Sequence, residues 1–203
     1  MKAAPFKDKR VIVFDLDGTI VRLSVEWISL KNKLMNEYLR IYEESCSFES
    51  VSACLSKIVE RNDDHVLESF IDTIRQYELE KIHETQPIEE TVFFINNKEL
   101  FGVKKNAKLA ILSLNTRETI ISSLKLTKIY NKFDIIVGRE DVRKWKPNPE
   151  GLLKIQKHYN ARREEMIYFG DLRKDVLTGN NAGIDAFLIN DLISLVNKKR
   201  DFK

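Results

Sequence analysis

The chain has 203 residues, of which 43% are hydrophobic and 32% are charged. It is long enough for one large core or two smaller ones, and no window approaches the ~20 apolar residues that a membrane helix needs. The 34 basic and 31 acidic residues leave a formal charge of only +3. This balance argues against a nucleic-acid partner, for which basic residues would cluster on one face or helix. It mildly favours small anionic substrates.

The N-terminal residues and the cysteines bear on the compartment. The first ten residues are charged and contain no apolar stretch of signal-peptide length, so we expect an intracellular, cytoplasmic protein without a membrane partner. Cys46 and Cys54 are too few for a disulfide framework in a chain of this size. Both lie in a segment expected to be helical, and we expect two half-buried free thiols.

The first expected strand is an unbroken run of mostly β-branched and aromatic residues at 10–14. Such runs fit strands that are buried on both faces, as in a parallel sheet. Similar runs follow at 108–112, 133–137, 166–169 and 186–189. Helical periodicity lies before or between them at 89–101, 117–125, 149–158 and 174–181. This alternation predicts an α/β fold with a doubly wound, mostly parallel sheet.

Residues 23–86 contain no convincing strand. They carry three amphipathic stretches with helical spacing, at 25–44, 49–60 and 63–84. Asn62-Asp63-Asp64 resembles a helix break followed by a new N-cap, and Pro87 is expected to open the next helix. We therefore predict a core made of 1–22 and 87–203, with an inserted α-helical cap at 23–86.

A pair of carboxylates directly follows the first expected strand, in Asp15-Leu16-Asp17-Gly18-Thr19. Ligands of α/β sheets gather at the carboxyl ends of strands, and a spacing of two directs both carboxylates to one side if the backbone stays extended. Asp15 can then act as a nucleophile while Asp17 serves as acid and base. Gly18 permits the sharp turn. The same residue types are common in turns, so the motif alone leaves a plain turn open.

Two further segments offer groups that bind phosphate. Ser113 directly follows the strand ending at 112, where a hydroxyl and free backbone N–H groups form a natural phosphate cradle. Asn115 and Thr116, just beyond it, fit better as N-caps of the next helix. Lys146 stands beside two prolines, Pro147 and Pro149, which restrict the backbone. An ammonium held there would neutralise a phosphate, although a solvated lysine is the alternative.

The last polar segment, Gly170-Asp171 followed by Asp175, comes after the strand at 166–169. Mg²⁺ prefers hard oxygen ligands, usually one or two carboxylates together with water and substrate phosphate. Asp15 and Asp171 fit that role, with Asp175 beside the metal or behind its ligands. The alternative is that both later carboxylates only cap or stabilise the following helix.

Together and in this order, these four segments resemble the signature motifs of the haloacid dehalogenase-like (HAD) hydrolase superfamily. The resemblance covers roughly 8–22 and 87–192, and the helical insertion lies where the phosphoglycolate phosphatase-like branch has its cap. Two residues depart from the family pattern. Leu114 separates Ser113 from Asn115, and Leu172 stands where a small residue often follows Gly-Asp.

The resemblance implies a Mg²⁺-dependent phosphatase that hydrolyses a small phosphorylated metabolite through an aspartyl-phosphate on Asp15. Asp17 would protonate the leaving oxygen and then activate water, while Ser113 and Lys146 would bind the phosphoryl oxygens.

The resemblance also implies a metal site and a cap that sets specificity. Asp15, the backbone carbonyl of Asp17 and Asp171 would bind Mg²⁺, and Asp175 would support the metal or Lys146. Arg22 and Trp27, together with Lys31, are nearest the catalytic loop in sequence and are candidates for substrate specificity. The substrate itself and the oligomeric state stay open.

Four alternatives accompany this prediction. Asp17 argues against a dehalogenase, which lacks the second acid, but a phosphomutase would retain it. A phosphonatase would need a cap lysine, for which Lys31 and Lys33 are available. A receiver-type signalling protein would not need the helical insertion. A catalytically inactive relative would be expected to have lost a key carboxylate or the lysine.

Overall fold

The computed structural model describes residues 6–201, and its centre is a five-stranded parallel sheet. The strand order is β5-β4-β1-β6-β7, with β1 (Val11–Phe14), β4 (Lys108–Leu112), β5 (Ile135–Val137), β6 (Met166–Gly170) and β7 (Asp185–Leu188). The chain thus begins at the middle strand and adds strands on both sides of it. This order confirms the predicted doubly wound α/β fold.

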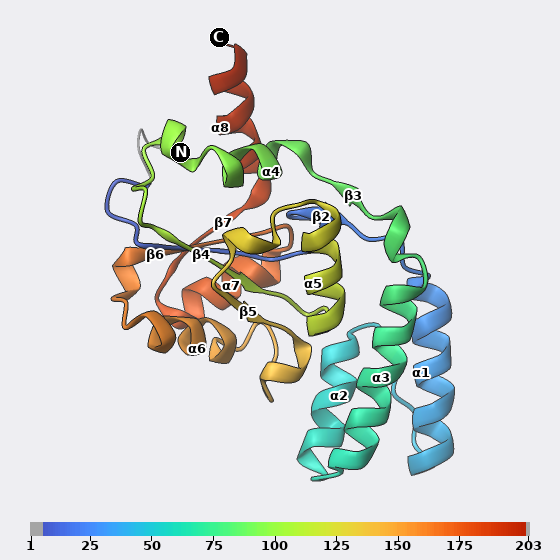
Figure 1. Cartoon of the computed structure of the whole chain (residues 1–203). Helices are drawn as coiled ribbons and strands as arrows, with labels where there is room; N and C mark the ends of the chain where they lie inside the picture. Colours follow the sequence, from blue (N-terminus) through green and yellow to red (C-terminus); the bar gives the residue numbers. More distant parts are fainter. Residues whose placement is uncertain (1–5, 202–203) are drawn as a thin grey trace.

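Helices cover both faces of the sheet (Figure 1). One face packs against α4 (Glu89–Asn96), α5 (Arg117–Leu126) and α8 (Ile189–Asp201), and the other against α6 (Glu150–Tyr159) and α7 (Arg173–Ala182). Alternate residues of β1 separate accordingly, because Ile12 and Phe14 join the first cluster while Val11 and Val13 join the second. Burial on both sides explains the unbroken apolar runs of the strands.

Three helices lie together outside the sheet: α1 (Trp27–Tyr42), α2 (Val51–Glu60) and α3 (Asp64–Glu80) (Figure 1). Tyr38, Phe48 and Phe70 form their aromatic core, with the Phe48 and Phe70 rings stacked at 5.9 Å between centroids. The predicted break and N-cap at 62–64 are confirmed, because Asp63 caps α3 and its Oδ1 accepts from the Val66 N–H at 3.2 Å. The domain boundaries at 22/23 and 86/87 remain a proposal.

Several short elements were not predicted. β2 (Val21–Arg22) and β3 (Gln86–Pro87) pair antiparallel where the chain leaves and re-enters the core. Pro87 therefore lies in a strand, and α4 begins two residues later. Two-residue strands show no periodicity that a sequence pattern can reveal. The 3₁₀ helices of the described residues are η1 (Ile82–Glu84), η2 (Lys98–Phe101), η3 (Tyr130–Lys132), η4 (Arg139–Asp141) and η5 (Arg163–Glu165).

The expectation of free thiols was wrong, because Cys46 and Cys54 form a disulfide. Only Cys54 is in a helix, since the chain between α1 and α2 is irregular and passes through left-handed residues at Glu43 and Phe48. This turn places the two cysteine Cα atoms 6.0 Å apart, whereas eight residues of continuous helix would separate them by about 12 Å. Within residues 6–201, none of the helices has the length and apolar character needed to cross a bilayer.

Candidate active site

The loop after β1 carries the first two candidate residues. Asp15 is buried, and its Oδ1 accepts from the Leu16 N–H at 2.7 Å. The loop closes when the Gly18 N–H donates to the Val21 carbonyl at 2.8 Å. Gly18 has φ +73°, and a Cβ at this position would overlap the carboxylate of Asp171. Glycine is therefore required both for the turn and for the close approach to the end of β6.

Asp17 is half-buried, and its Oδ1 accepts from the Leu23 N–H at 2.9 Å. Burial raises the pKa of Asp17 to about 6, against the lowering effect of the Leu23 hydrogen bond. The negative charge of Asp15 contributes to this raised pKa. A carboxyl group with such a pKa can both give and take a proton near neutral pH.

Lys146 is buried in contact with two carboxylates. Its Nζ lies 2.8 Å from Asp15 Oδ2 and 2.5 Å from Asp175 Oδ1, and it donates to the Tyr168 hydroxyl at 3.1 Å. The remaining oxygen of Asp175, Oδ2, accepts from the Leu172 N–H at 3.0 Å. Burial alone would lower the pKa of Lys146, but the two carboxylates raise it above its ordinary value. The ammonium is therefore retained and fixed beside Asp15.

Three carboxylates meet where β1 and β6 end. Asp15, Asp171 and Asp175 each offer an oxygen, and these atoms lie within 4.8 Å of one another. Burial, together with the charges of Asp15 and Asp175, raises the pKa of Asp171 to about 6. Burial also raises the pKa of Asp15, against the lowering effect of Lys146.

This cluster suits a divalent cation. Among the described residues, Lys146 is the only ammonium that pairs with any of these carboxylates, and it contacts Asp15 and Asp175, so negative charge remains to be neutralised. Hard carboxylate oxygens are the ligands that Mg²⁺ prefers. Asp175 is already bound by Lys146, Tyr168 and Leu172. Asp15 and Asp171 are therefore the better ligands, and the residues fit a magnesium ion.

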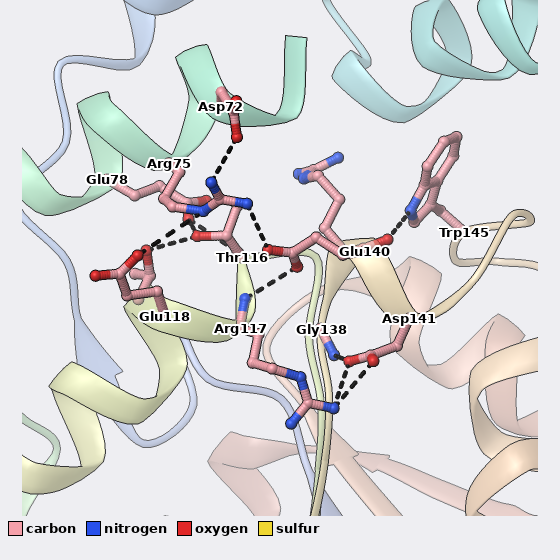
Figure 2. A network of polar contacts seen from close by, with 12 residues as sticks. Asp72, Arg75, Glu78, Thr116, Arg117, Glu118, Gly138, Glu140, Asp141 and Trp145 are labelled. Carbon is pink, nitrogen blue, oxygen red and sulfur yellow. Dashed lines mark hydrogen bonds and ion pairs between the residues drawn. The ribbon is translucent and has the colours of Figure 1, made fainter. Parts of the chain in front are cut away.

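The loop after β4 is joined to α3 by a buried carboxylate. Ser113 Oγ donates to Asn115 Oδ1 at 2.9 Å, and Asn115 Nδ2 donates to Glu78 Oε1 at 2.9 Å. Glu78 Oε2 accepts from the Thr116 N–H and hydroxyl at 2.9 and 2.8 Å (Figure 2). Thr116 is the residue before α5, as expected of a cap, but its side chain makes no capping hydrogen bond to a helix N–H. Its hydroxyl donates to Glu78 and also lies 2.8 Å from the Thr119 hydroxyl of α5.

A cavity of about 540 Å³ opens over these groups, within the range of small-molecule sites. Four of the residues predicted to act in catalysis, phosphate binding or metal binding line it: Asp15, Asp17, Ser113 and Asp171. Trp27 and Lys31 of α1 also line it. Lys146 and Asp175 lie behind Asp15, outside the lining, and reach the site through the contacts described above. Arg22 is exposed on β2 and is not a lining residue.

Comparison with known proteins places this site in a family. The family described as haloacid dehalogenase-like hydrolase matches residues 12–189. The chain belongs to the haloacid dehalogenase-like hydrolase family. This confirms the predicted family and enzyme class, a hydrolase of the phosphatase type.

Two relatives with the same name illustrate the similarity. Pyrophosphatase PpaX of Halalkalibacterium halodurans is 31% identical over 198 residues, covering 94% of this chain and 88% of the relative. Pyrophosphatase PpaX of Bacillus cereus strain G9842 is 31% identical over 179 residues, covering 85% and 79%.

Solved structures share the fold. CbbY from Rhodobacter sphaeroides in complex with phosphate has a TM-score of 0.61 at 15% identity, covering 89% of this chain and 85% of that one. A predicted phosphoglycolate phosphatase from Haemophilus somnus has a TM-score of 0.59 at 14% identity, covering 93% and 91%. At these identities the likeness establishes the fold alone.

Sequence reasoning missed three polar residues at the site of this hydrolase. Arg139 is 4% exposed and follows the end of β5, so the rule that located Ser113 would also have located it. Lys174 lines the cavity next to Asp175, and its pKa is lowered by burial and by repulsion from Lys146. Glu78 had no detectable signal, because a glutamate within an amphipathic helix pattern ordinarily faces solvent.

Proposed function

We propose that this hydrolase is a Mg²⁺-dependent phosphatase that transfers a phosphoryl group to Asp15 and then to water. The observation that carries the proposal is the 2.8 Å contact between the carboxylate of Asp15 and the buried ammonium of Lys146. Ser113 and Asp171 line the same cavity. Phosphoryl transfer depends mainly on positioning and on neutralising charge, which this arrangement supports.

The first step forms a bond between an Asp15 carboxylate oxygen and phosphorus while the bond from phosphorus to the leaving oxygen breaks. Asp17 gives its proton to that leaving oxygen. In the second step, water attacks phosphorus and gives a proton to Asp17, and the bond between phosphorus and Asp15 breaks. Inorganic phosphate leaves and both carboxyl groups return to their starting states. The pKa of Asp17, about 6, suits both proton transfers.

The remaining residues bind and orient. The Ser113 hydroxyl and the Lys146 ammonium would bind phosphoryl oxygens, and Asp175 would keep Lys146 in place. Asp15, Asp171 and the backbone carbonyl of Asp17 would hold Mg²⁺, which when bound would add positive charge beside the phosphoryl group. Trp27 would contact the rest of the substrate from the cap side of the cavity.

The substrate we propose is a small phosphate ester or pyrophosphate. The name of the relatives, pyrophosphatase PpaX, favours pyrophosphate, since the similarity extends over 94% of the chain. A phosphonatase is the second candidate, because Lys31 of α1 lines the cavity and offers an amine. A phosphonoaldehyde therefore belongs in the substrate panel, and a phosphomutase is tested by following isomerisation of a sugar phosphate.

The test is phosphate release from phosphoglycolate, a sugar phosphate, a nucleotide, pyrophosphate and p-nitrophenyl phosphate. We expect activity that is lost on chelation with EDTA and restored by Mg²⁺. Asp15→Asn should lower kcat by at least about 10³-fold, because the nucleophile is removed. Asp191→Asn, an exposed carboxylate on α8, is the matched control and should keep full activity.

Two results would contradict the proposal. Equal activity in wild type and Asp15→Asn would remove Asp15 as the nucleophile. Activity that is unaffected by EDTA would remove the metal. An acid-quenched reaction adds a direct reading, since the phosphoenzyme should carry one phosphoryl group on the peptide that contains Asp15.

A further inference from the structure

The guanidinium of Arg139 is a buried cation without a paired anion in the part of the chain that the structure describes. The residue is 4% exposed, and its Nε and Nη1 are buried atoms with no hydrogen-bond partner among residues 6–201. Leaving a buried ion unpaired is costly, and burial lowers the pKa of Arg139 accordingly. An unsatisfied buried group of this kind calls for a specific explanation.

The two carboxylates that offset the charge of Arg139 are bound to other groups (Figure 2). Both carboxylate oxygens of Glu78 accept hydrogen bonds from Asn115 and Thr116. Glu140 accepts from Arg75 Nη2 at 3.2 Å and from the Arg117 N–H at 3.0 Å. The donors of Arg139 therefore remain available to a ligand.

The backbone of Arg139 is held on both sides. Its N–H donates to the Asn115 carbonyl at 2.9 Å, and its own carbonyl accepts from Trp145 Nε1 at 2.9 Å. Gly138, immediately before it, packs so closely that a Cβ would lie 3.0 Å from the backbone nitrogen of Arg117. Arg139 is thus anchored at the end of β5, beside the loop after β4 that carries Ser113.

Arg139 lines the same cavity as Asp15 and Ser113, together with Lys174 and Lys31. The transferred phosphoryl group is already served by Lys146, which contacts Asp15 directly. A guanidinium elsewhere in the lining matches a different part of the bound molecule. Phosphate and carboxylate groups both accept two parallel hydrogen bonds from a guanidinium.

We propose that Arg139 binds a second anionic group, a phosphate or a carboxylate, on a substrate whose first phosphoryl group reacts at Asp15. This inference rests on the proposed phosphatase function and narrows its substrate to molecules with two anionic ends. Pyrophosphate represents the phosphate arm, and phosphoglycolate represents the carboxylate arm.

The experiment measures binding without turnover, by calorimetry on Asp15→Asn protein with Mg²⁺. The probes are pyrophosphate, phosphoglycolate and inorganic phosphate. Adding Arg139→Gln should weaken pyrophosphate or phosphoglycolate binding by about 10- to 100-fold, because a charged hydrogen-bond donor is lost. Inorganic phosphate, which has no second group, should change by less than about 3-fold. The probe whose affinity falls more shows whether Arg139 binds a phosphate or a carboxylate as the second anionic group.

Two further variants control this measurement. Arg40→Gln, an exposed arginine on α1, should leave all three affinities unchanged. Arg139→Lys should recover part of the lost affinity because it keeps the charge but not the bidentate geometry. The melting temperature of Arg139→Gln should equal or exceed that of the parent, since the replaced cation is unpaired. If the Gln variant fails to fold, the Lys variant carries the affinity comparison.

The inference is overturned if Arg139→Gln weakens inorganic phosphate as much as the larger probes, which would place Arg139 on the transferred group. It is also overturned if no probe binds, or if none is affected. Failure of the proposed phosphatase function can be recognised separately. It would appear as wild-type protein that does not turn over p-nitrophenyl phosphate, or as Asp15→Asn protein that still does, and neither result depends on Arg139 binding a second anion.

Discussion

The two sides of the cavity balance their buried charges in different ways. Where β1 and β6 end, Lys146 contacts both Asp15 and Asp175, so each of these charges has a partner. Where β4 and β5 end, Arg139 has no paired anion among residues 6–201, and Glu78 is bound by hydrogen-bond donors of Asn115 and Thr116.

This difference separates two tasks. Charges that are paired in the folded protein, as Lys146 is with Asp15 and Asp175, hold their atoms in place before a substrate arrives, as chemistry at Asp15 requires. A charge left unpaired is stabilised only when a ligand supplies the partner, as recognition requires. Removing the charge of Asp175 should therefore destabilise the protein, whereas removing the charge of Arg139 should leave it as stable, or more so.

The largest expected effect concerns Asp17, in the loop after β1 that also carries Asp15. Asp17→Asn should lower kcat by about 10²- to 10⁴-fold, because the proton donor for the leaving oxygen and the base for water are both lost. With p-nitrophenyl phosphate, whose leaving group needs little protonation, the first turnover should be spared more than the second. Stopped-flow absorbance should then show a burst of p-nitrophenol followed by slow turnover.

The alcohol-type substrates of the panel provide the comparison for this burst. A sugar phosphate should show no burst with Asp17→Asn, since its leaving oxygen needs the proton in the first step. If kcat falls by the same factor for both substrates and neither shows a burst, Asp17 does not act as acid in the first step and base in the second as proposed.

The next prediction concerns the stability contributed by the paired charges where β1 and β6 end. Asp175→Asn removes a carboxylate that binds Lys146, Tyr168 and Leu172, and it should lower the free energy of unfolding by about 3 kcal/mol. Urea unfolding measures the change through the midpoint and slope. Asp64→Asn is the control, because its ion pair with Arg143 is exposed and should contribute little.

Asp175→Asn also sharpens the contrast with Arg139→Gln, which should leave the unfolding free energy unchanged or raised. The proposed division between paired and unpaired charges fails if the two substitutions destabilise the protein equally.

Much of this site could be predicted because ligands of α/β sheets bind where the strands end. Asp15, Ser113 and Asp171 each follow a buried apolar run, and parallel strands must bring such residues to one edge. The same rule applies to Arg139, but β5 is only three residues long and is followed by Arg139-Glu140-Asp141, a charged run of the kind that solvated turns also show.

Contacts between the cap helices and the core could not be predicted in this way. Helical periodicity indicates which residues of α3 share a face, but it carries no information on what that face meets. Glu78 is 1% exposed because Asn115 and Thr116 offer it three donors, and those residues are 37 and 38 positions away in sequence. The disulfide between Cys46 and Cys54 likewise depends on a turn that no sequence spacing indicated.

The smallest expected effect concerns Glu78, which binds the loop after β4 and also offsets the charge of Arg139. Glu78→Gln places an amide NH₂ against hydrogen-bond donors and should lower the free energy of unfolding by about 2 kcal/mol. It also removes a negative charge that offsets Arg139. The cost should therefore be smaller in an Arg139→Gln background, with a coupling of about 0.5–1 kcal/mol in a double-mutant cycle followed by urea unfolding. A coupling of zero would mean that Glu78 serves the loop after β4 alone, and the burial of Arg139 would then be offset only by Glu140 and by the ligand.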